Sequence, residues 1–423
     1  MTPEVRDRIE QIRHGNVPEG YIQTRSGIVP IEWTDACLGD VYTERKEPGN
    51  EDLPLLMVSI HSGVSDGEVD EDDLPKKVKR IEDKSQYKRA AKGDLVFNMM
   101  RAWQGAIGTV RTEGMVSPAY IVAEPNDMVD PLFMDYYMKT NRMVHTLYRQ
   151  SYGVTDFRLR LYWDSFVPIQ CVLPSVKEQK KIAEILTTQD KVIELEGRKI
   201  EEIKKAKQFF LSKMFPKKGQ PVPEIRCKGF TDAWEQRKWS NTVDISTDMV
   251  DPKTGLYDEL PHVAPGNIES FTGRLFDNVK LVKDENLISG KFRFSAGDII
   301  YGKINPQLGK YVFAAFSGLT SADAYVLNAK NGIDQKFLYA VLQTKDFFDY
   351  SVSVSKRSGM PKINRDELNA YSFAAPSTAE QAKIGSFLLG IDNLITLHQR
   401  KLEEEKKKKK ALMQLLLTGI VRV

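Results

Sequence analysis

The stretch PSVKEQKKI at residues 174–182 returns as PSTAEQAKI at residues 376–384, and this repetition determines how the chain is organised. The similarity continues past both stretches. Residues 173–215 align with residues 375–417 at a constant offset of 202, without a gap, and 17 of the 43 paired positions are identical. Self-similarity at a fixed spacing indicates a repeated structural unit. The chain of 423 residues is therefore interpreted as a tandem duplication.

Each repeated segment is predicted to form one long helix. Ser175 and Ser377 each precede a glutamate by three positions, which is the capping-box spacing of a helix start. The first helix is expected to stop near Phe215-Pro216, because proline cannot continue a helix, and the second near Thr418-Gly419. Each helix would hold about 37 residues and extend about 55 Å.

Apolar residues in both segments recur at alternating steps of four and three, the period of a coiled-coil seam. One such narrow stripe does not stabilise a lone helix in water, so the two helices are expected to pack together. An antiparallel pairing would place the intervening regions at opposite ends and make the helices a ruler. The predicted seam residues are Ile182, Leu186, Ile193, Ile200, Ile203, Phe210, Ile384, Leu388, Ile391, Ile395, Leu402 and Leu412.

Polar residues interrupt this seam. Glu196 and His398 either set the register of the pair or face solvent, and both alternatives remain open. The stripe is also weak around Glu405–Lys409.

The regions between the helices each place short strand-like runs before helical stretches, which favours α+β domains. The run GDLVF at 93–97 parallels GDIIY at 297–301, so the duplication includes these regions. The predicted organisation is a short N-terminal helical segment (1–19), a first globular domain (20–173), a long helix (174–216), a second globular domain (217–373) and a second long helix (374–423).

Basic residues with aromatic or glycine neighbours occur in both globular domains. Lysine and arginine neutralise phosphates, and arginine also reads base edges. Loops containing Gly153 and Gly359 lie at matching places before the two long helices, where small residues permit close approach to a nucleic-acid backbone; an ordinary solvated loop is the alternative. The candidates for DNA contact are Arg101, Gly153, Arg158, Arg160, Lys303, Lys356, Arg357, Gly359 and Lys362.

Composition sets weaker limits on function. A net charge of +3 and a pI near 8.4 are compatible with nucleic-acid binding without requiring it. The three cysteines form no C-x-x-C pair, and reduced thiols are expected. The charged N-terminus does not resemble a signal peptide, and no stretch approaches the ~18–20 apolar residues that cross a bilayer, so a cytoplasmic location is expected.

Motifs for catalysis are weak or missing. Asn305-Pro306-Gln307-Leu308 lacks the second proline and the aromatic residue of an adenine methyltransferase tetrad. The glycines around Lys303 and Lys310 do not fit the P-loop spacing, and the five histidines show no metal-ligand spacing. No catalytic residue, metal site or cofactor is predicted. The competing hypotheses are a stand-alone DNA methyltransferase and a structural coiled-coil adaptor.

The paired Pro-Ser-x-x-Glu-Gln helices resemble those of type I restriction–modification specificity subunits. GFTDAWEQR at 229–237 is similar to the family's opening of a second globular domain, and IEW at 31–33 with LGD at 38–40 is similar to the opening of the first. The resemblance covers essentially the whole chain.

This resemblance implies a non-catalytic DNA reader. Each globular domain would be a target-recognition domain for one half of a bipartite, asymmetric site in double-stranded DNA. The helices would be the conserved regions that fix the spacer and dock two modification (methyltransferase) subunits, which restriction (nuclease-translocase) subunits would join. S-adenosylmethionine and ATP with Mg²⁺ would belong to those partner subunits. Residues 1–19 are an addition in which Val5, Ile9 and Ile12 share one helix face, and packing near the distal ends of the long helices is their expected role.

Overall fold

The structure is a computed structural model, which describes residues 2–24, 27–60, 63–65, 83–153, 158–356 and 359–423. Two compact units divide the chain. The first comprises Met1–Glu194 and Glu403–Val423, and the second comprises Leu195–Leu402. Since the long helices are α6 (Val176–Lys213) and α11 (Thr378–Leu416), each helix contributes one part to each unit.

The first unit starts with helix α1, and its strands precede most of its other helices. Its strands are β1 (Tyr21–Thr24), β2 (Gly27–Pro30), β3 (Thr34–Cys37), β4 (Tyr42–Glu44), β5 (Val58–Ser59), β6 (Gly63–Val64), β7 (Lys88–Ala90), β8 (Leu95–Asn98), β9 (Ile107–Thr109), β10 (Gly114–Val116), β11 (Tyr120–Pro125) and β12 (Gln170–Leu173). Its shorter helices are α1 (Pro3–Arg13), α2 (Leu38–Val41), η2 (Lys84–Gln86), η3 (Ala102–Gln104), α3 (Pro131–Met138), α4 (Asn141–Gln150) and α5 (Trp163–Phe166).

The second unit resembles the first in the order of its elements from β3 onward, with additional short elements between residues 250 and 291. Its strands are β13 (Glu235–Lys238), β14 (Val243–Ile245), β15 (Met249–Val250), β16 (Pro261–Val263), β17 (Lys280–Leu281), β18 (Lys291–Phe294), β19 (Ile299–Gly302), β20 (Tyr311–Phe313), β21 (Gly318–Thr320), β22 (Ala324–Ala329) and β23 (Ser372–Ala375). Its shorter helices are α7 (Trp239–Thr242), η4 (Pro252–Thr254), η5 (Pro265–Asn267), η6 (Val282–Asp284), η7 (Pro306–Leu308), α8 (Gln335–Val341), α9 (Lys345–Val354) and α10 (Arg365–Ala370).

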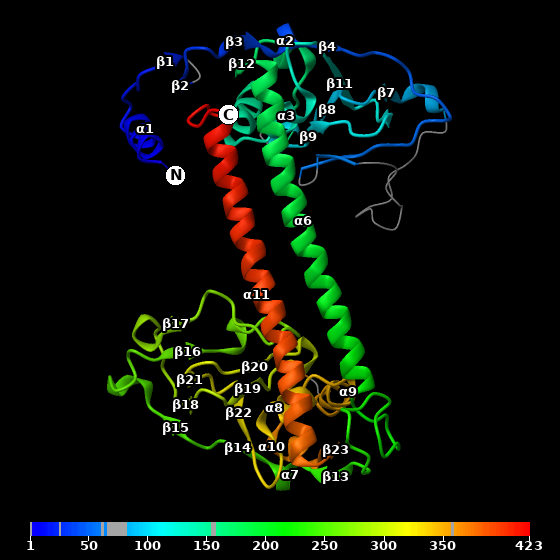
Figure 1. Cartoon of the computed structure of the whole chain (residues 1–423), viewed down its shortest axis with the longest axis vertical. Helices are drawn as coiled ribbons and strands as arrows, with labels where there is room; N and C mark the ends of the chain where they lie inside the picture. The colour runs from blue at the N-terminus through cyan, green and yellow to red at the C-terminus, as the bar shows by residue number, and fades with distance from the viewer. Residues whose placement is uncertain (1, 25–26, 61–62, 66–82, 154–157, 357–358) are drawn as a thin grey trace. The chain divides into compact units, whose positions relative to one another are not determined.

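The duplication extends to sheet topology. The central sheet has the antiparallel order β4-β11-β8-β9 in the first unit and β14-β22-β19-β20 in the second (Figure 1). The strand just before each long helix pairs with a strand near the start of its globular domain, as β12 with β3 and β23 with β13. The second unit also has a five-stranded sheet, β15-β18-β21-β16-β17, in which β16 and β21 are parallel. The predicted α+β class is confirmed.

A glutamine fixes each long helix to its own globular domain. The Gln179 side chain donates to the carbonyls of Pro174 and Met128 and accepts from the Asp130 amide. Gln381 makes the same bonds with Pro376, Gly332 and Asp334. Asp130 and Asp334 in turn cap α3 and α8. The second residue of the Glu-Gln pair therefore joins two helix starts, which explains why it occurs in both copies.

The first residue of the Glu-Gln pair has a different role from the expected capping box. Ser175 does accept from the Glu178 amide. The Glu178 carboxylate, however, binds the Arg422 guanidinium through two bonds of 2.6 and 2.9 Å. Glu380 binds Arg226 in the same two-fold manner, at 2.9 Å in both bonds. Each glutamate thus holds the chain segment that follows the end of the other long helix.

The long helices run antiparallel where they pack within each unit. In the first unit Gln189 contacts Glu405, and Ile182 and Leu186 share a core with Leu416. In the second unit Glu196 contacts His398, and the Phe210 and Phe387 rings lie 4.9 Å apart. Helix α6 ends at Lys213 and helix α11 at Leu416, each two residues before the predicted stops near Phe215 and Thr418.

The N-terminal segment packs on the end of the chain. Arg8 of α1 donates to the Ile420 carbonyl at 2.9 Å, and the Tyr21 hydroxyl donates to the Gly419 carbonyl at 2.7 Å. The Arg8 guanidinium also lies over the Tyr21 ring. These contacts agree with the expected packing of this segment beside the end of a long helix.

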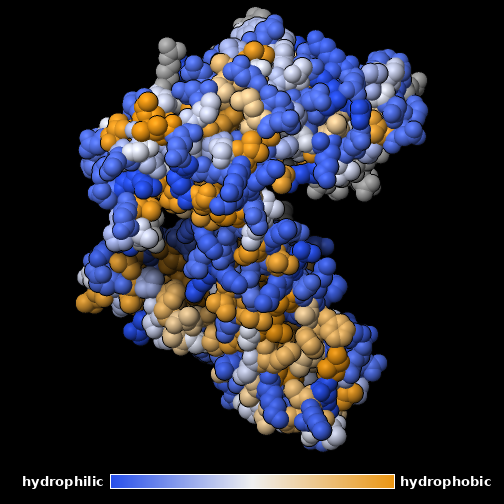
Figure 2. Space-filling view, turned by 45° about the horizontal axis from the view of Figure 1, so that its top comes forward, coloured by the Kyte–Doolittle hydropathy of each residue, from blue (hydrophilic) through white to orange (hydrophobic). Residues whose placement is uncertain are grey.

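The surface of the first unit is largely hydrophilic on the face drawn in Figure 2, with hydrophobic residues in scattered groups. None of the described helices combines the length and the apolar composition that crossing a membrane requires.

Candidate nucleic-acid interface

In the first unit, a closed loop carries Gly153, Arg158 and Arg160. Tyr152 and Arg160 exchange backbone hydrogen bonds of 3.1 and 3.0 Å across its base. A Cβ atom on Gly153 would lie 2.2 Å from the Arg158 carbonyl oxygen, so glycine is required for this closure. Both arginines are exposed. Gly153 therefore shapes a loop that presents two guanidinium groups to solvent.

A second loop lies beside this one and carries Arg101. The Leu161 amide donates to the Met99 carbonyl at 2.9 Å, which ties the two loops together. Arg101 is exposed at the start of η3. The first unit thus brings Arg101, Gly153, Arg158 and Arg160 into one region of the fold.

The second unit ties its two corresponding loops together in the same way. The Ile363 amide donates to the Lys303 carbonyl at 3.0 Å, and the Asn305 amide donates to the Pro361 carbonyl at 2.8 Å. Lys356, Gly359 and Lys362 are exposed, and Lys303 is half-buried with its ammonium group 5.5 Å from the centre of the Tyr325 ring. Arg357 lies outside the described residues.

The basic side chains proposed to contact DNA differ in their ion pairing from the basic side chains that stabilise the fold. Arg45 binds Asp94 at 2.7 Å, Arg111 binds Asp135 at 3.2 Å, and Arg422 binds Glu178. Within the described ranges, no carboxylate forms an ion pair with the candidates Arg101, Arg158, Arg160, Lys303, Lys356 and Lys362. Their charges are therefore available to phosphates, which stabilise cationic side chains by the same Coulombic attraction.

Aromatic residues surround the first pair of loops, where the sequence led us to expect aromatic neighbours of the basic residues. Tyr148 and Tyr152 are exposed, and their rings lie 6.0 Å from Trp103 and 5.0 Å from Tyr162, respectively. Exposed Met100 adds an apolar side chain. Aromatic rings beside arginines are typical of nucleic-acid-binding surfaces. Trp103 and Tyr152 are among the aromatic neighbours of basic residues noted in the sequence, whereas their ring partners Tyr148 and Tyr162 were not recognised.

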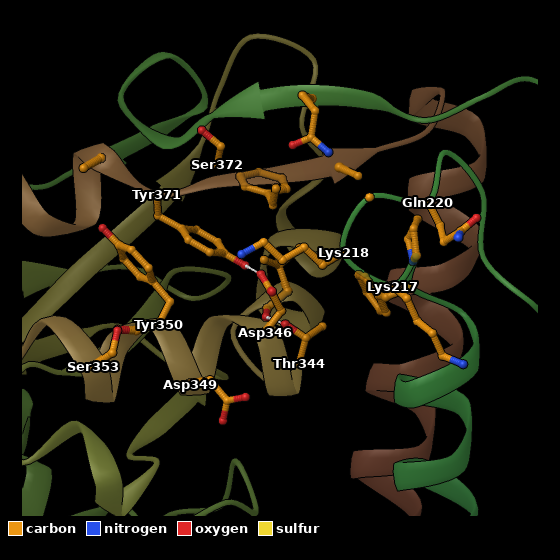
Figure 3. A pocket seen from close by; sticks show the side chains of 18 residues that line it. Lys217, Lys218, Gln220, Thr344, Asp346, Asp349, Tyr350, Ser353, Tyr371 and Ser372 are labelled. Carbon is orange, nitrogen blue, oxygen red and sulfur yellow. Dashed lines mark hydrogen bonds between the residues drawn. The ribbon is translucent and has the colours of Figure 1, made fainter.

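A cavity of about 660 Å³ in the second unit contains two carboxylates, Asp346 and Asp349 (Figure 3). The Tyr371 hydroxyl donates to Asp346 at 2.8 Å, and Lys345 pairs with Asp349 at 2.6 Å. Burial, followed by the Asp346 charge, raises the pKa of Tyr371 well above its usual value. Both carboxylates thus have structural partners. Among the described residues, no group of three histidine, cysteine, aspartate or glutamate side chains is arranged to hold a metal ion.

The predicted seam residues all lie at buried or half-buried positions. Ile182, Leu186, Ile200, Ile384, Leu388 and Ile395 are buried, and Ile193, Ile203, Phe210, Ile391, Leu402 and Leu412 are half-buried.

Polar groups complete the contact between the helices. His398 Nδ1 lies 2.9 Å from Glu196 Oε2, and both side chains are 10 % exposed, so neither faces solvent. Lys401 donates to the other Glu196 oxygen at 2.5 Å, and Lys207 pairs with buried Asp392. Burial raises the pKa of Asp392, and the Lys207 charge opposes that shift. Polar pairs at fixed places favour one register of the two helices.

The weak part of the predicted seam is also polar. The Gln189 amide donates to Glu405 at 2.6 Å, and Lys409 pairs with Asp190 at 2.5 Å.

The arrangement of two similar α+β units and an antiparallel helix pair matches a known family. The family model described as "Type I restriction modification DNA specificity domain" matches residues 30–205 and 248–406 of the sequence. Because these ranges cover most of the chain, the chain belongs to this family and is a non-catalytic DNA specificity subunit of a type I restriction–modification system. In this family the cofactors belong to the modification and restriction subunits.

Individual relatives show how far the likeness extends. The chain is 30 % identical over 241 residues to the type I restriction enzyme EcoDI specificity subunit of Escherichia coli, a match that spans 51 % of this chain and about half (53 %) of that relative. It is 24 % identical to the MjaVIII specificity subunit of Methanocaldococcus jannaschii over 93 % of this chain and 94 % of that protein.

Solved structures have the same fold. The specificity subunit from M. genitalium aligns with a TM-score of 0.58 at 13 % identity, covering 91 % of this chain and 96 % of that one. A chain from a study of complex assembly and conformational transition of the type I system aligns with a TM-score of 0.51 at 16 % identity, covering 93 % and 99 %.

Proposed function

We propose that this specificity subunit reads a bipartite, asymmetric site in double-stranded DNA, with one half-site contacted by each globular domain. The observation that carries this proposal is the pairing of conserved architecture with different surfaces. The two units share sheet order, loop ties and the glutamine bonds described above. Their exposed loop residues differ, because the first unit presents arginines and the second presents lysines.

The candidate basic residues supply affinity in this proposal. Arg101, Arg158, Arg160, Lys303, Lys356, Arg357 and Lys362 neutralise phosphates or approach base edges, and the Gly153 and Gly359 loops follow the DNA backbone. Phosphate contacts make binding strongly salt-dependent, since each contact releases counterions from the duplex.

The helix pair is the scaffold. Two modification subunits dock on α6 and α11 and bring S-adenosylmethionine, and restriction subunits join them with ATP and Mg²⁺. The continuous length of the helices fixes the spacer between half-sites. In this proposal, residues 20–173 and 217–373 are the two reading domains, and the long helices that carry the partner subunits lie outside these ranges.

Methylation mapping tests the proposal. The chain is expressed with its modification subunits in a host that lacks other methyltransferases, and modified adenines are located by sequencing genomic DNA. One motif with two different halves and a constant gap is the expected result. Modification without a defined motif, or the same motif when this chain is omitted, would refute the proposed function.

A further inference from the structure

Two loops occupy equivalent positions in the two units but present different side chains. They follow the equivalent strands β8 and β19 at an offset of 204, and are called here the matched loops (98–105 and 302–309). Each contains a three-residue helical turn, η3 or η7, and each ends on a left-handed glycine, Gly105 (φ 97°) or Gly309 (φ 54°).

Equivalent hydrogen bonds close the two turns, although Arg101 (φ −135°) and Asn305 (φ 50°) differ in backbone conformation. The Gly105 amide donates to Ala102 at 2.9 Å, and the Gly309 amide donates to Pro306 at 3.0 Å. Ala102 and Pro306 are both buried and anchor the turns. Each loop is also tied to the glycine loop of its own unit, through the backbone bonds of Met99 and of Lys303. The backbone at both places is therefore a rigid platform.

The exposed side chains on the two platforms differ in hydrogen-bonding chemistry. The first loop presents Arg101, whose planar guanidinium has no ion-pair partner among the described residues. The second has half-buried Asn305 at the equivalent position and presents exposed Gln307 two residues further along, where the first loop has Trp103. The Gln307 amide nitrogen lies 3.3 Å from Asn305 Oδ1, which restrains the glutamine and leaves its oxygen and one N–H for a ligand.

These side chains match different base edges. Arginine forms paired hydrogen bonds with guanine O6 and N7, whereas glutamine forms them with adenine N6 and N7. We infer that the matched loops are base-reading elements, with Arg101 selecting a G·C pair in one half-site and Gln307 selecting an A·T pair in the other. This inference rests on the proposed function and adds the residues that determine specificity.

The flanking groups support this assignment. Lys356 and Lys362 lie on the neighbouring loop in the second unit, and Arg158 and Arg160 lie on the neighbouring loop in the first. Cations on adjacent loops hold phosphates, which positions the central loop against the groove.

Motif mapping with single substitutions tests the inference. Arg101→Ala is expected to relax one G·C position of one half-site by roughly tenfold or more in relative methylation rate, and Gln307→Ala to relax one A·T position of the other half-site to a similar degree. Gln307→Arg is expected to convert that A·T preference toward G·C. Arg13→Ala and Gln220→Ala, which remove the same side-chain types far along the chain from the matched loops, should leave the motif unchanged.

The outcomes are distinguishable from failure of the proposed function. If wild type yields a bipartite motif and both matched-loop variants keep it unaltered, the loops do not read bases and the inference is overturned. A uniform loss of methylation at all sequences, with a shallower salt dependence of DNA binding, would show phosphate contact and would also overturn it. Failure of the proposed function would instead appear in the wild type, as the lack of any defined motif. Thermal unfolding of each variant checks that the fold is retained.

Discussion

At the scale of single residues, the contacts of Glu178 and Glu380 explain why both copies of the Pro-Ser-x-x-Glu-Gln motif contain a glutamate. Glu178 and Glu380 lie in the first turns of the long helices, where a carboxylate is also favoured by the helix dipole. Their ion pairs with Arg422 and Arg226 add specific partners, and the Glu380 side chain is fully buried. The sequence predicted the helix start from these glutamates, but not their partners, because the arginines follow the far end of the other helix.

Removing Arg226 from its ion pair with buried Glu380 should lower the free energy of unfolding. Arg226→Ala leaves the Glu380 carboxylate buried without its cation, and a loss of about 3 kcal/mol in unfolding free energy is expected in urea titration. Arg226→Ala combined with Glu380→Gln should recover part of that loss.

The exposed Arg13–Glu10 pair provides the matched control. Arg13→Ala should cost less than about 0.5 kcal/mol, because exposed ion pairs contribute little. Equal losses for Arg226→Ala and Arg13→Ala would show that the Glu380 pair is not a structural clamp.

Glu196 should make stability depend on pH in the acidic range. Its bonds from Lys401 and then His398 lower the pKa of its carboxyl below 4.5 in the folded state. A depressed carboxyl pKa contributes stability that is present above the unfolded pKa and is lost as pH falls through the folded value. The stability difference between wild type and Glu196→Gln should therefore shrink as pH is lowered from 6 toward 3, as measured by chemical unfolding. A difference that stays constant over that range would contradict this role.

At the scale of elements, the hydrophobic period was enough to predict the long helices, and the order of strand-like runs before helical stretches was enough to predict the α+β class. One of the strand-like runs, Leu55–Ile60, is only partly a strand in the structure, because β5 holds Val58–Ser59 and Leu55 forms an isolated parallel bridge with Met115. The helical region 131–148 is divided into α3 and α4 by the Thr140 cap. The Thr140 cap is a local contact with the Met143 amide, which a hydrophobic period does not reveal, and strand partners depend on tertiary neighbours.

The helix pair should be sensitive to its buried polar contact. Lys207→Ala leaves the buried Asp392 carboxylate without its cation and should destabilise the second unit by about 3 kcal/mol. Lys207→Met with Asp392→Leu, which replaces the pair with apolar side chains of similar size, should restore most of that stability. Both are measured by urea unfolding of the full chain, and a double variant as unstable as Lys207→Ala would contradict the account.

At the scale of the whole molecule, the duplication predicted the architecture but not the DNA-contact residues in detail. Repeated residues mark the framework, whereas the side chains proposed to contact DNA differ between the two units. Arg101, Arg158 and Arg160 were proposed as DNA contacts from their charge and neighbours, whereas Gln307 became a candidate only because its loop matches that of Arg101.

The proposed ruler has a measurable consequence. Deleting one heptad from the middle of both α6 and α11 keeps the seam on one face and shortens each helix by about 10 Å. The spacer of the methylated motif should then shorten by about three base pairs at about 3.4 Å each, while both half-sites stay the same. An unchanged spacer in an active complex would show that helix length does not set it.

Domain exchange tests most directly the claim that two globular domains read two half-sites. Residues 217–373 are replaced by the second globular domain of another family member, and the motif is mapped with the modification subunits present. One half of the motif should change, while the other half is retained. A motif in which both halves change, or in which neither does, would contradict independent reading by the two domains.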